Sequence, residues 1–154
     1  MSLRDYIGRS LDLCIFSGLA QFGMQPVTQT LQGNTACTGV QKLAQLVTIW
    51  LLTIKGSVMG HPTWGTDFLM SVRSGRVRTT ADLTMVFGGA AVDILNFTTN
   101  ERPGPLPDDE VLVSLTLESA AVLGDHIDLT ARITTAAGAA RTALLPIRVP
   151  LIRR

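Results

Sequence analysis

The sequence predicts an α+β fold, in which two helices pack on one face of a small antiparallel sheet of about three strands. Two observations predict it: apolar residues recur at helical spacings up to about residue 96, and the period then changes to two. The chain has 154 residues, which is enough for one domain with a core of its own. We assign residues 1–39 to an extended N-terminal arm and residues 40–154 to the α+β domain.

The arm begins with a short apolar segment. Leu11, Leu13 and Ile15 alternate with other residues there, which indicates a strand. Turn-forming residues then interrupt any long element: Gly18, Gly23, Pro26, Gly33 and Asn34. We expect this segment to lie along its own core or along a neighbouring protein.

The first helix is expected to end at Lys55. Its apolar residues at spacings of three and four are Val40, Leu43, Ala44, Val47 and Leu51. Thr38 and Gln41 have the spacing of a capping box, in which each side chain binds a backbone N–H of the first turn. Lys55 followed by Gly56 is typical of a helix C-terminus.

A loop and a short connector follow the first helix. Pro62 and Gly65 are expected to hold Trp64 in a rigid loop that packs back on the helix. Residues 72–78 carry three arginines around Gly75, so this connector is expected to be too short and too charged to enter the core.

A second helix is predicted over residues 81–96. Thr79 and Asp82 repeat the spacing of a capping box before a run of apolar residues at helical intervals. Gly88 and Gly89 lie within this helix, and each costs about 1 kcal/mol relative to alanine. Either the close approach of another backbone or a kink would explain them.

The last third of the chain predicts a meander of strands. Residues 100–109 contain three prolines and form a connector. Alternating apolar residues then predict strands at 111–118 and 127–134, joined as a hairpin with one solvated face. Residues 142–149 form a third strand, and Pro146 favours an edge position or a departing arm for it.

Composition limits the classes of function. Hydrophobic residues make up 46% of the chain and charged residues 16%, below the roughly 25% that is usual, which favours extensive contacts with partners. Lys42 and Lys55 enclose only twelve residues of the most apolar segment, against the roughly 20 that a membrane span needs. A net charge of +1 without a basic and aromatic run argues against nucleic-acid binding. Cys14 and Cys37 have no metal-binding spacing and are expected to be buried thiols.

No motif indicates catalysis. Asp108, Asp109 and Glu110 could serve glycoside hydrolysis or hold a metal, but a solvated loop or a partner contact is the preferred interpretation. His61 before Pro62 is expected to fill a hydrogen bond of the loop rather than to act as a base. We expect no enzyme, no catalytic or metal-binding residue and no cofactor. A small hydrolase of the lysozyme type and a generic homo-oligomeric domain are the alternatives.

Several features taken together resemble the sheath-initiator or baseplate wedge family of contractile phage tails, the lysozyme-like baseplate family. The likeness covers residues 38–149. The order of the later elements also agrees, with a capped second helix followed by the strand meander. The residues that carry it are Leu51, Leu52, Thr53, Gly56, Pro62, Gly65, Phe68, Thr80, Ala81 and Asp82. The family has an arginine where this chain has Ser57 and Val58, and its Glu-Pro-Arg motif corresponds to Glu101, Arg102 and Pro103 in a different order.

The resemblance implies a structural protein of the virion, located in the tail baseplate and assembled in the host cytoplasm. It implies a ring of about six copies that joins the wedge proteins to the tail tube and starts assembly of the sheath protein, with no nucleic acid or membrane as partner. The wedge contact would fall on Glu101 and Arg102. The strand that pairs with the sheath would contain Ala143, Leu145, Ile147 and Val149.

Overall fold

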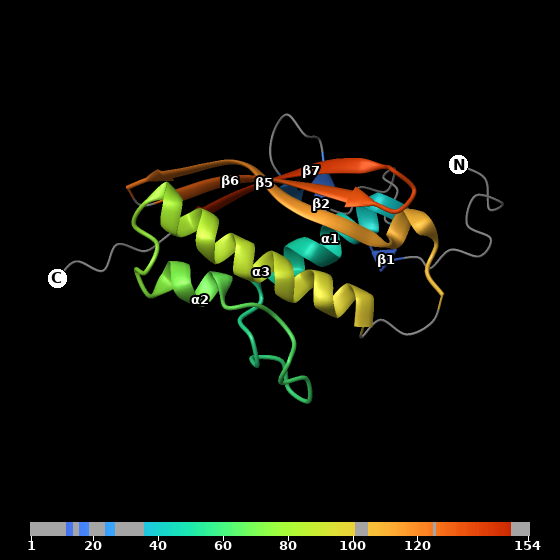
Figure 1. The fold of residues 1–154 in the computed structure, drawn as a ribbon, viewed down its shortest axis with the longest axis horizontal. Helices are drawn as coiled ribbons and strands as arrows, with labels where there is room; N and C mark the ends of the chain where they lie inside the picture. The colour runs from blue at the N-terminus through green and yellow to red at the C-terminus, as the bar shows by residue number, and fades with distance from the viewer. Residues whose placement is uncertain are drawn as a thin grey trace.

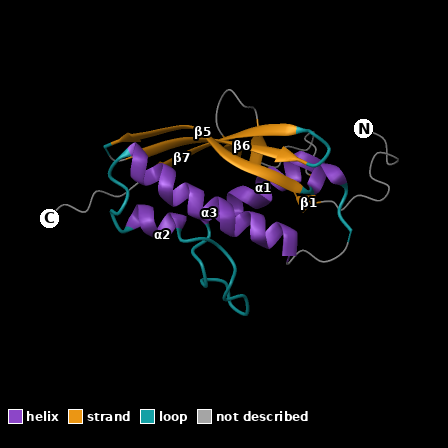
Figure 2. Ribbon diagram, viewed as in Figure 1, coloured by secondary structure: helices purple, strands orange, loops and turns teal. Residues whose placement is uncertain are grey.

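The computed structural model describes residues 12–13, 16–18, 24–26, 36–100, 105–124 and 126–148. Its main body has two layers, a three-stranded antiparallel sheet and a layer of helices beneath it (Figures 1 and 2). The predicted α+β class is therefore confirmed. The helices are α1 (Gly39–Leu52), α2 (Phe68–Arg73), α3 (Thr80–Asn100) and the 3-10 helix η2 (Asp108–Glu110). The strands of the sheet are β5 (Leu112–Leu123), β6 (His126–Thr135) and β7 (Ala140–Arg148).

The sheet has the order β5-β6-β7, so β7 lies at an edge. Both pairs are antiparallel, and Leu129 of β6 lies between Ala120 of β5 and Leu145 of β7. Pro146 pairs with Asp128 in a ladder without a register shift. The edge position that Pro146 predicted is confirmed.

The two predicted strands of the hairpin differ in regularity. On β6 every second residue is buried against the helices: Ile127, Leu129, Ala131, Ile133 and Thr135. On β5 the register shifts between Leu112 and Ser114, so Leu112 is buried and Val113 is 56% exposed. The strict alternation predicted from residue 111 is wrong at this point, because a bulge moves the next side chain to the other face.

Helix α1 differs from its prediction at both ends. Thr38 makes no side-chain capping bond, because Gly39 has φ 59 and the first residue of the helix lacks helical backbone. The helix ends at Leu52 rather than Lys55. Thr53 is extended, and its carbonyl accepts from the N–H of Thr66 at 2.9 Å. Pairing with a segment across the loop thus replaces the last predicted turn.

The connector at residues 72–78 is not excluded from the core, which corrects the prediction. Val72 is 1% exposed and Val77 is 8% exposed. Helix α2, which the sequence analysis missed, places Phe68 and Val72 one turn apart on the buried side. Gly75 has φ 73, and the N–H of Arg76 donates to Ser71, which turns the chain back toward the core.

Helix α3 begins with the predicted capping box. The N–H of Asp82 donates to Thr79 Oγ1 at 3.1 Å, and the N–H of Thr79 donates to Asp82 Oδ2 at 3.0 Å. The helix continues to Asn100, four residues beyond the predicted end. Gly88 and Gly89 have open space where a Cβ would lie, so the close approach of another backbone does not explain them.

Four short strands lie in the described parts of the first 39 residues. They are β1 (Asp12–Leu13), β2 (Phe16–Gly18), β3 (Met24–Pro26) and β4 (Ala36–Cys37), paired as β1-β4 and β2-β3. Asp12 Oδ2 accepts a hydrogen bond from Gln45 Nε2 of α1 at 3.3 Å. Cys37 is buried as predicted, and Cys14 lies outside the described residues. None of the described helices is long and apolar enough to span a bilayer.

An ion pair joins α1 to the start of the sheet. Lys42 Nζ lies 3.0 Å from Glu110 Oε2, and the side chain of Glu110 is fully buried. The expectation that Glu110 is solvated with Asp108 and Asp109 is therefore wrong; of the three, Asp108 is exposed. A carboxylate tolerates burial only beside a cation or several hydrogen-bond donors, and Lys42 supplies that cation.

The Asp82 cap makes stability depend on pH. Hydrogen bonds hold the pKa of the Asp82 carboxyl below its ordinary value. The N–H of Arg78 has the largest effect, and the side chain and the N–H of Thr79 have smaller effects. Because the pKa is lower in the folded chain, the ionised carboxyl stabilises the fold at a pH above its pKa in the unfolded chain, which is roughly 4. This stabilisation is lost as the pH falls through the pKa of the folded chain. We expect Asp82→Ala to be less stable than the parent at pH 7 in urea unfolding. The difference should shrink below pH 4, and a difference that stays the same from pH 7 to pH 2 would contradict the role of the Asp82 carboxylate in the cap.

The buried ion pair gives a second prediction. Lys42→Met should lower the free energy of unfolding by about 3–5 kcal/mol, because it leaves the Glu110 carboxylate buried without its cation. The double variant Lys42→Met/Glu110→Met should recover most of that loss, since no charge is then buried. Urea denaturation of the three proteins measures both values. A loss below about 1 kcal/mol in Lys42→Met would show that the pair behaves as a surface contact.

Candidate functional site

The residues assigned to the sheath-pairing strand lie on β7. Ala143, Leu145 and Ile147 are 5%, 6% and 9% exposed, because their side chains face the helix layer. Val149 lies outside the described residues, as do the two residues assigned to the wedge contact, Glu101 and Arg102. These three side chains anchor the strand, so a partner that pairs with β7 would contact its main chain.

The outer edge of β7 has a defined pattern of main-chain groups. Proline is accepted in a regular ladder where its missing N–H would point to the open side. Successive residues of a strand direct their main-chain groups to opposite sides, so Pro146 implies that Thr142 and Leu144 direct theirs outward. Among the described strands β6 alone forms a ladder with β7, although β3 lies close to it.

A second candidate surface surrounds the loop of residues 53–67, which projects from the helix layer (Figure 2). Main-chain hydrogen bonds hold it on both sides, including Gly56 N–H to the carbonyl of Trp64 at 3.0 Å. The Trp64 ring packs edge-on against Trp50 of α1, with ring centroids 5.5 Å apart. The prediction that the loop packs back on the helix is confirmed. His61 contributes main-chain hydrogen bonds to the loop, and its side chain is exposed.

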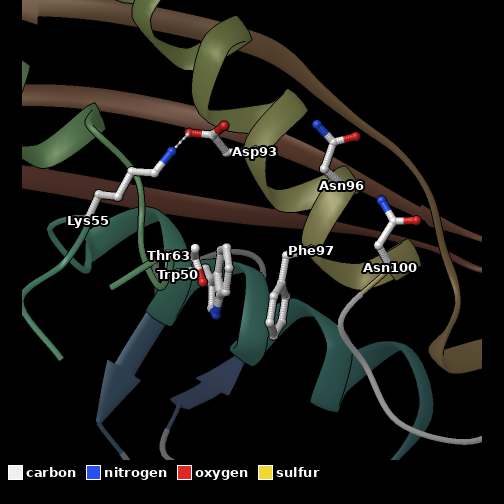
Figure 3. Close-up of a pocket in the computed structure, with 7 residues that line it drawn as sticks. All are labelled: Trp50, Lys55, Thr63, Asp93, Asn96, Phe97 and Asn100. Atoms are coloured by element: carbon white, nitrogen blue, oxygen red, sulfur yellow. Dashed lines mark hydrogen bonds and ion pairs between the residues drawn. The ribbon is translucent and has the colours of Figure 1, made fainter. Parts of the chain in front are cut away.

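A hollow of about 200 Å³ lies between this loop and α3 (Figure 3). Trp50 and Phe97 form its aromatic side, stacked with ring centroids 3.7 Å apart. Lys55 Nζ and Asp93 Oδ2 lie 3.4 Å apart at its edge. The remaining residues that line it are Thr63, Asn96 and Asn100.

The chemistry of this hollow suits contact with a polar group more than catalysis. Among the described residues Asp93 is the only carboxylate that lines it, and it is paired with Lys55. Asn96 and Asn100 lie one helical turn apart and can both donate and accept hydrogen bonds. Across the described parts of the chain, no three His, Cys, Asp or Glu side chains gather where they could hold a metal ion.

The sequence analysis did not identify this hollow, although part of its signal was present. Asp93, Asn96 and Asn100 have the spacing that places side chains on one face of a helix. The sequence predicts that Lys55 ends the first helix. Its pairing with Asp93 depends on how the loop folds back, which the sequence spacing does not reveal.

Comparisons of the chain with protein-family models, with curated proteins and with solved structures find no match.

The loop depends on Gly65. It has φ 94, and a Cβ there would lie 2.5 Å from the carbonyl oxygen of Thr53. Gly65→Ala should cost about 1–2 kcal/mol for the left-handed backbone and about 1–3 kcal/mol more for the clash. Gly60→Ala is the matched control, because Gly60 has φ 80 and open space around it. Thermal and urea unfolding compare the two, and equal losses would contradict the close approach at Gly65.

Proposed function

We propose that this chain is a non-enzymatic structural component of a contractile-tail baseplate. It joins the wedge proteins to the tail tube and starts sheath assembly by pairing a strand with the sheath protein. About six copies form a ring in the virion. The observation that carries the proposal is β7, a nine-residue edge strand with a regular ladder on one side and no ladder on the other among the described strands.

An edge strand of this kind supports binding through the main chain. A strand added to a sheet edge gains affinity from main-chain hydrogen bonds and needs few specific side chains. Natural proteins usually blunt exposed edges with charges, bulges or cover. The β6-β7 ladder contains no register shift, and Ala143, Leu145 and Ile147 hold the strand against the helices. The edge is therefore held in place before a partner arrives, which lowers the entropic cost of binding.

The composition agrees with a protein surrounded by partners. Only 16% of the residues are charged, and the mean hydropathy is +0.31. The resemblance carried by the first helix, the loop and the capped second helix supplies the identity of those partners. The roles of Glu101, Arg102 and Val149 belong to the same proposal.

A proline substitution at the outer edge tests the strand pairing. Thr142→Pro removes an N–H that points outward, so the domain should remain folded while pairing with a sheath subunit is lost. Co-expression with the candidate sheath protein, followed by pull-down and negative-stain microscopy, measures binding and sheath seeding. Thr142→Val is the matched control, since it removes the 3.3 Å side-chain contact to Glu118 but keeps the N–H.

Truncation separates the edge from the residues beyond it. A chain ending at residue 148 keeps the buried Ile147, so its fold should be retained.

If Thr142→Pro binds and seeds sheath as well as the parent does, the contact lies away from β7. Absence of binding by every version, including the parent, would remove the main support for the proposal.

A further inference from the structure

A second hollow, of about 370 Å³, lies between α2 and α3. These two helices run side by side in the helix layer (Figure 1). Its apolar lining residues are Phe68, Val86 and Ala90, of which Phe68 and Ala90 are almost fully buried, and Gly89 leaves room on the α3 side. Lys55, Asp67, Ser71, Met85 and Asp93 complete the lining.

The helices beside this hollow expose methionines. Met85 lines it and is 72% exposed, and Met70 of α2 is 49% exposed. Methionine is unbranched and polarisable, so it adapts its shape to an apolar partner. Large exposed apolar side chains around a hollow indicate a contact surface for another protein.

The turn that joins α2 to α3, next to this hollow in sequence, carries three arginines. Arg73 ends α2, and Arg76 and Arg78 follow in the turn that leads to α3; all three side chains are exposed. Within the described residues none of the three makes an ion pair. The turn itself is fixed, because the N–H groups of Ser74, Gly75 and Arg76 donate to carbonyls of α2.

Asp82 lies close enough to Arg78 for the arginine's charge to help lower the pKa of its carboxyl, whereas Arg73 and Arg76 make no ion pair with a described carboxylate. Asp82 accepts hydrogen bonds from two main-chain N–H groups, and Asp93 is paired with Lys55. Asp67 precedes α2, at the end opposite Arg73. The α2–α3 turn beside the hollow is thus basic, whereas the other end holds Asp67 and the Lys55–Asp93 pair.

We propose that this surface, formed by the hollow, Met70, Met85 and the three arginines, binds an amphipathic helical segment of a partner protein. The apolar face of that segment fills the hollow, and carboxylates at one of its ends contact Arg73, Arg76 and Arg78. Guanidinium groups bind carboxylates through two parallel hydrogen bonds, which gives this end its selectivity. The inference does not rest on β7 or on the identity of the baseplate partners.

A protein segment suits this surface better than a nucleic acid does. Single-stranded nucleic acids bind where bases stack on exposed aromatic rings beside a basic track. The aromatic ring at this hollow, Phe68, is only 1% exposed. An apolar lining beside a basic turn matches the helix-in-groove mode of peptide recognition.

Synthetic peptides test the proposal. The probe is a helical peptide with leucines at positions i, i+3, i+4 and i+7 and glutamates at one end, labelled for fluorescence anisotropy. A second peptide carries lysines in place of the glutamates. We expect the glutamate peptide to bind the full-length chain at least about tenfold more tightly than the lysine peptide, with an affinity that falls as salt rises.

Variants assign the binding to the surface. Arg73→Gln/Arg76→Gln should weaken the glutamate peptide about tenfold and should leave the fold intact, because it spares the Arg78 contact to Gly75. Arg132→Gln is the matched control, since Arg132 is an exposed arginine on the sheet. Equal binding of the two peptides, unchanged binding by the double variant, or tighter binding of a single-stranded DNA oligonucleotide would each overturn the proposal. So would the absence of glutamate-peptide binding to the parent chain.

Discussion

The burial of Glu110 beside Lys42 is the constraint on which the rest of the structure depends. The pair joins the first turn of α1 to the short helix that leads into β5, across 68 residues of sequence. A buried carboxylate without a cation would be strongly destabilising, so the two elements must keep this arrangement. The sheet is thereby fixed over α1, and every inward side chain of β6 and β7 follows from that placement.

This arrangement separates the two proposed contact surfaces. The open edge belongs to the sheet layer, and the hollow beside the α2–α3 turn belongs to α2 and α3 in the helix layer. Ile147 on β7 and Phe68 on α2 both have their side chains in the same core. A partner strand at β7 and a partner helix at the hollow would therefore bind different layers of the same domain.

Local patterns were predictable from the sequence, and long-range pairings were not. The Thr79–Asp82 capping box and the alternation of β6 depend on residues close in sequence, and both are found as expected. The end of α1 is set instead by Thr66, whose hydroxyl donates to the carbonyl of Leu51. The sequence favours a solvated Glu110 because Lys42, the cation that pairs with it, lies in another element. The hollow beside Lys55 and Asp93 is not predictable from the sequence for the same reason, because the two residues belong to different elements.

Among the described residues, most of the exposed large apolar side chains belong to the helix layer and its loop. Of the six large hydrophobic side chains that are exposed among the described residues, four lie there or on its loop: Met59, Met70, Met85 and Val92. The outer face of the sheet carries polar pairs instead, such as Arg132 with Glu118 at 3.4 Å. Met59 is 97% exposed on a loop held by main-chain hydrogen bonds, so little entropy would be lost when a partner covers it. The side chains of the helix layer and the main chain of the sheet edge thus offer two different modes of association.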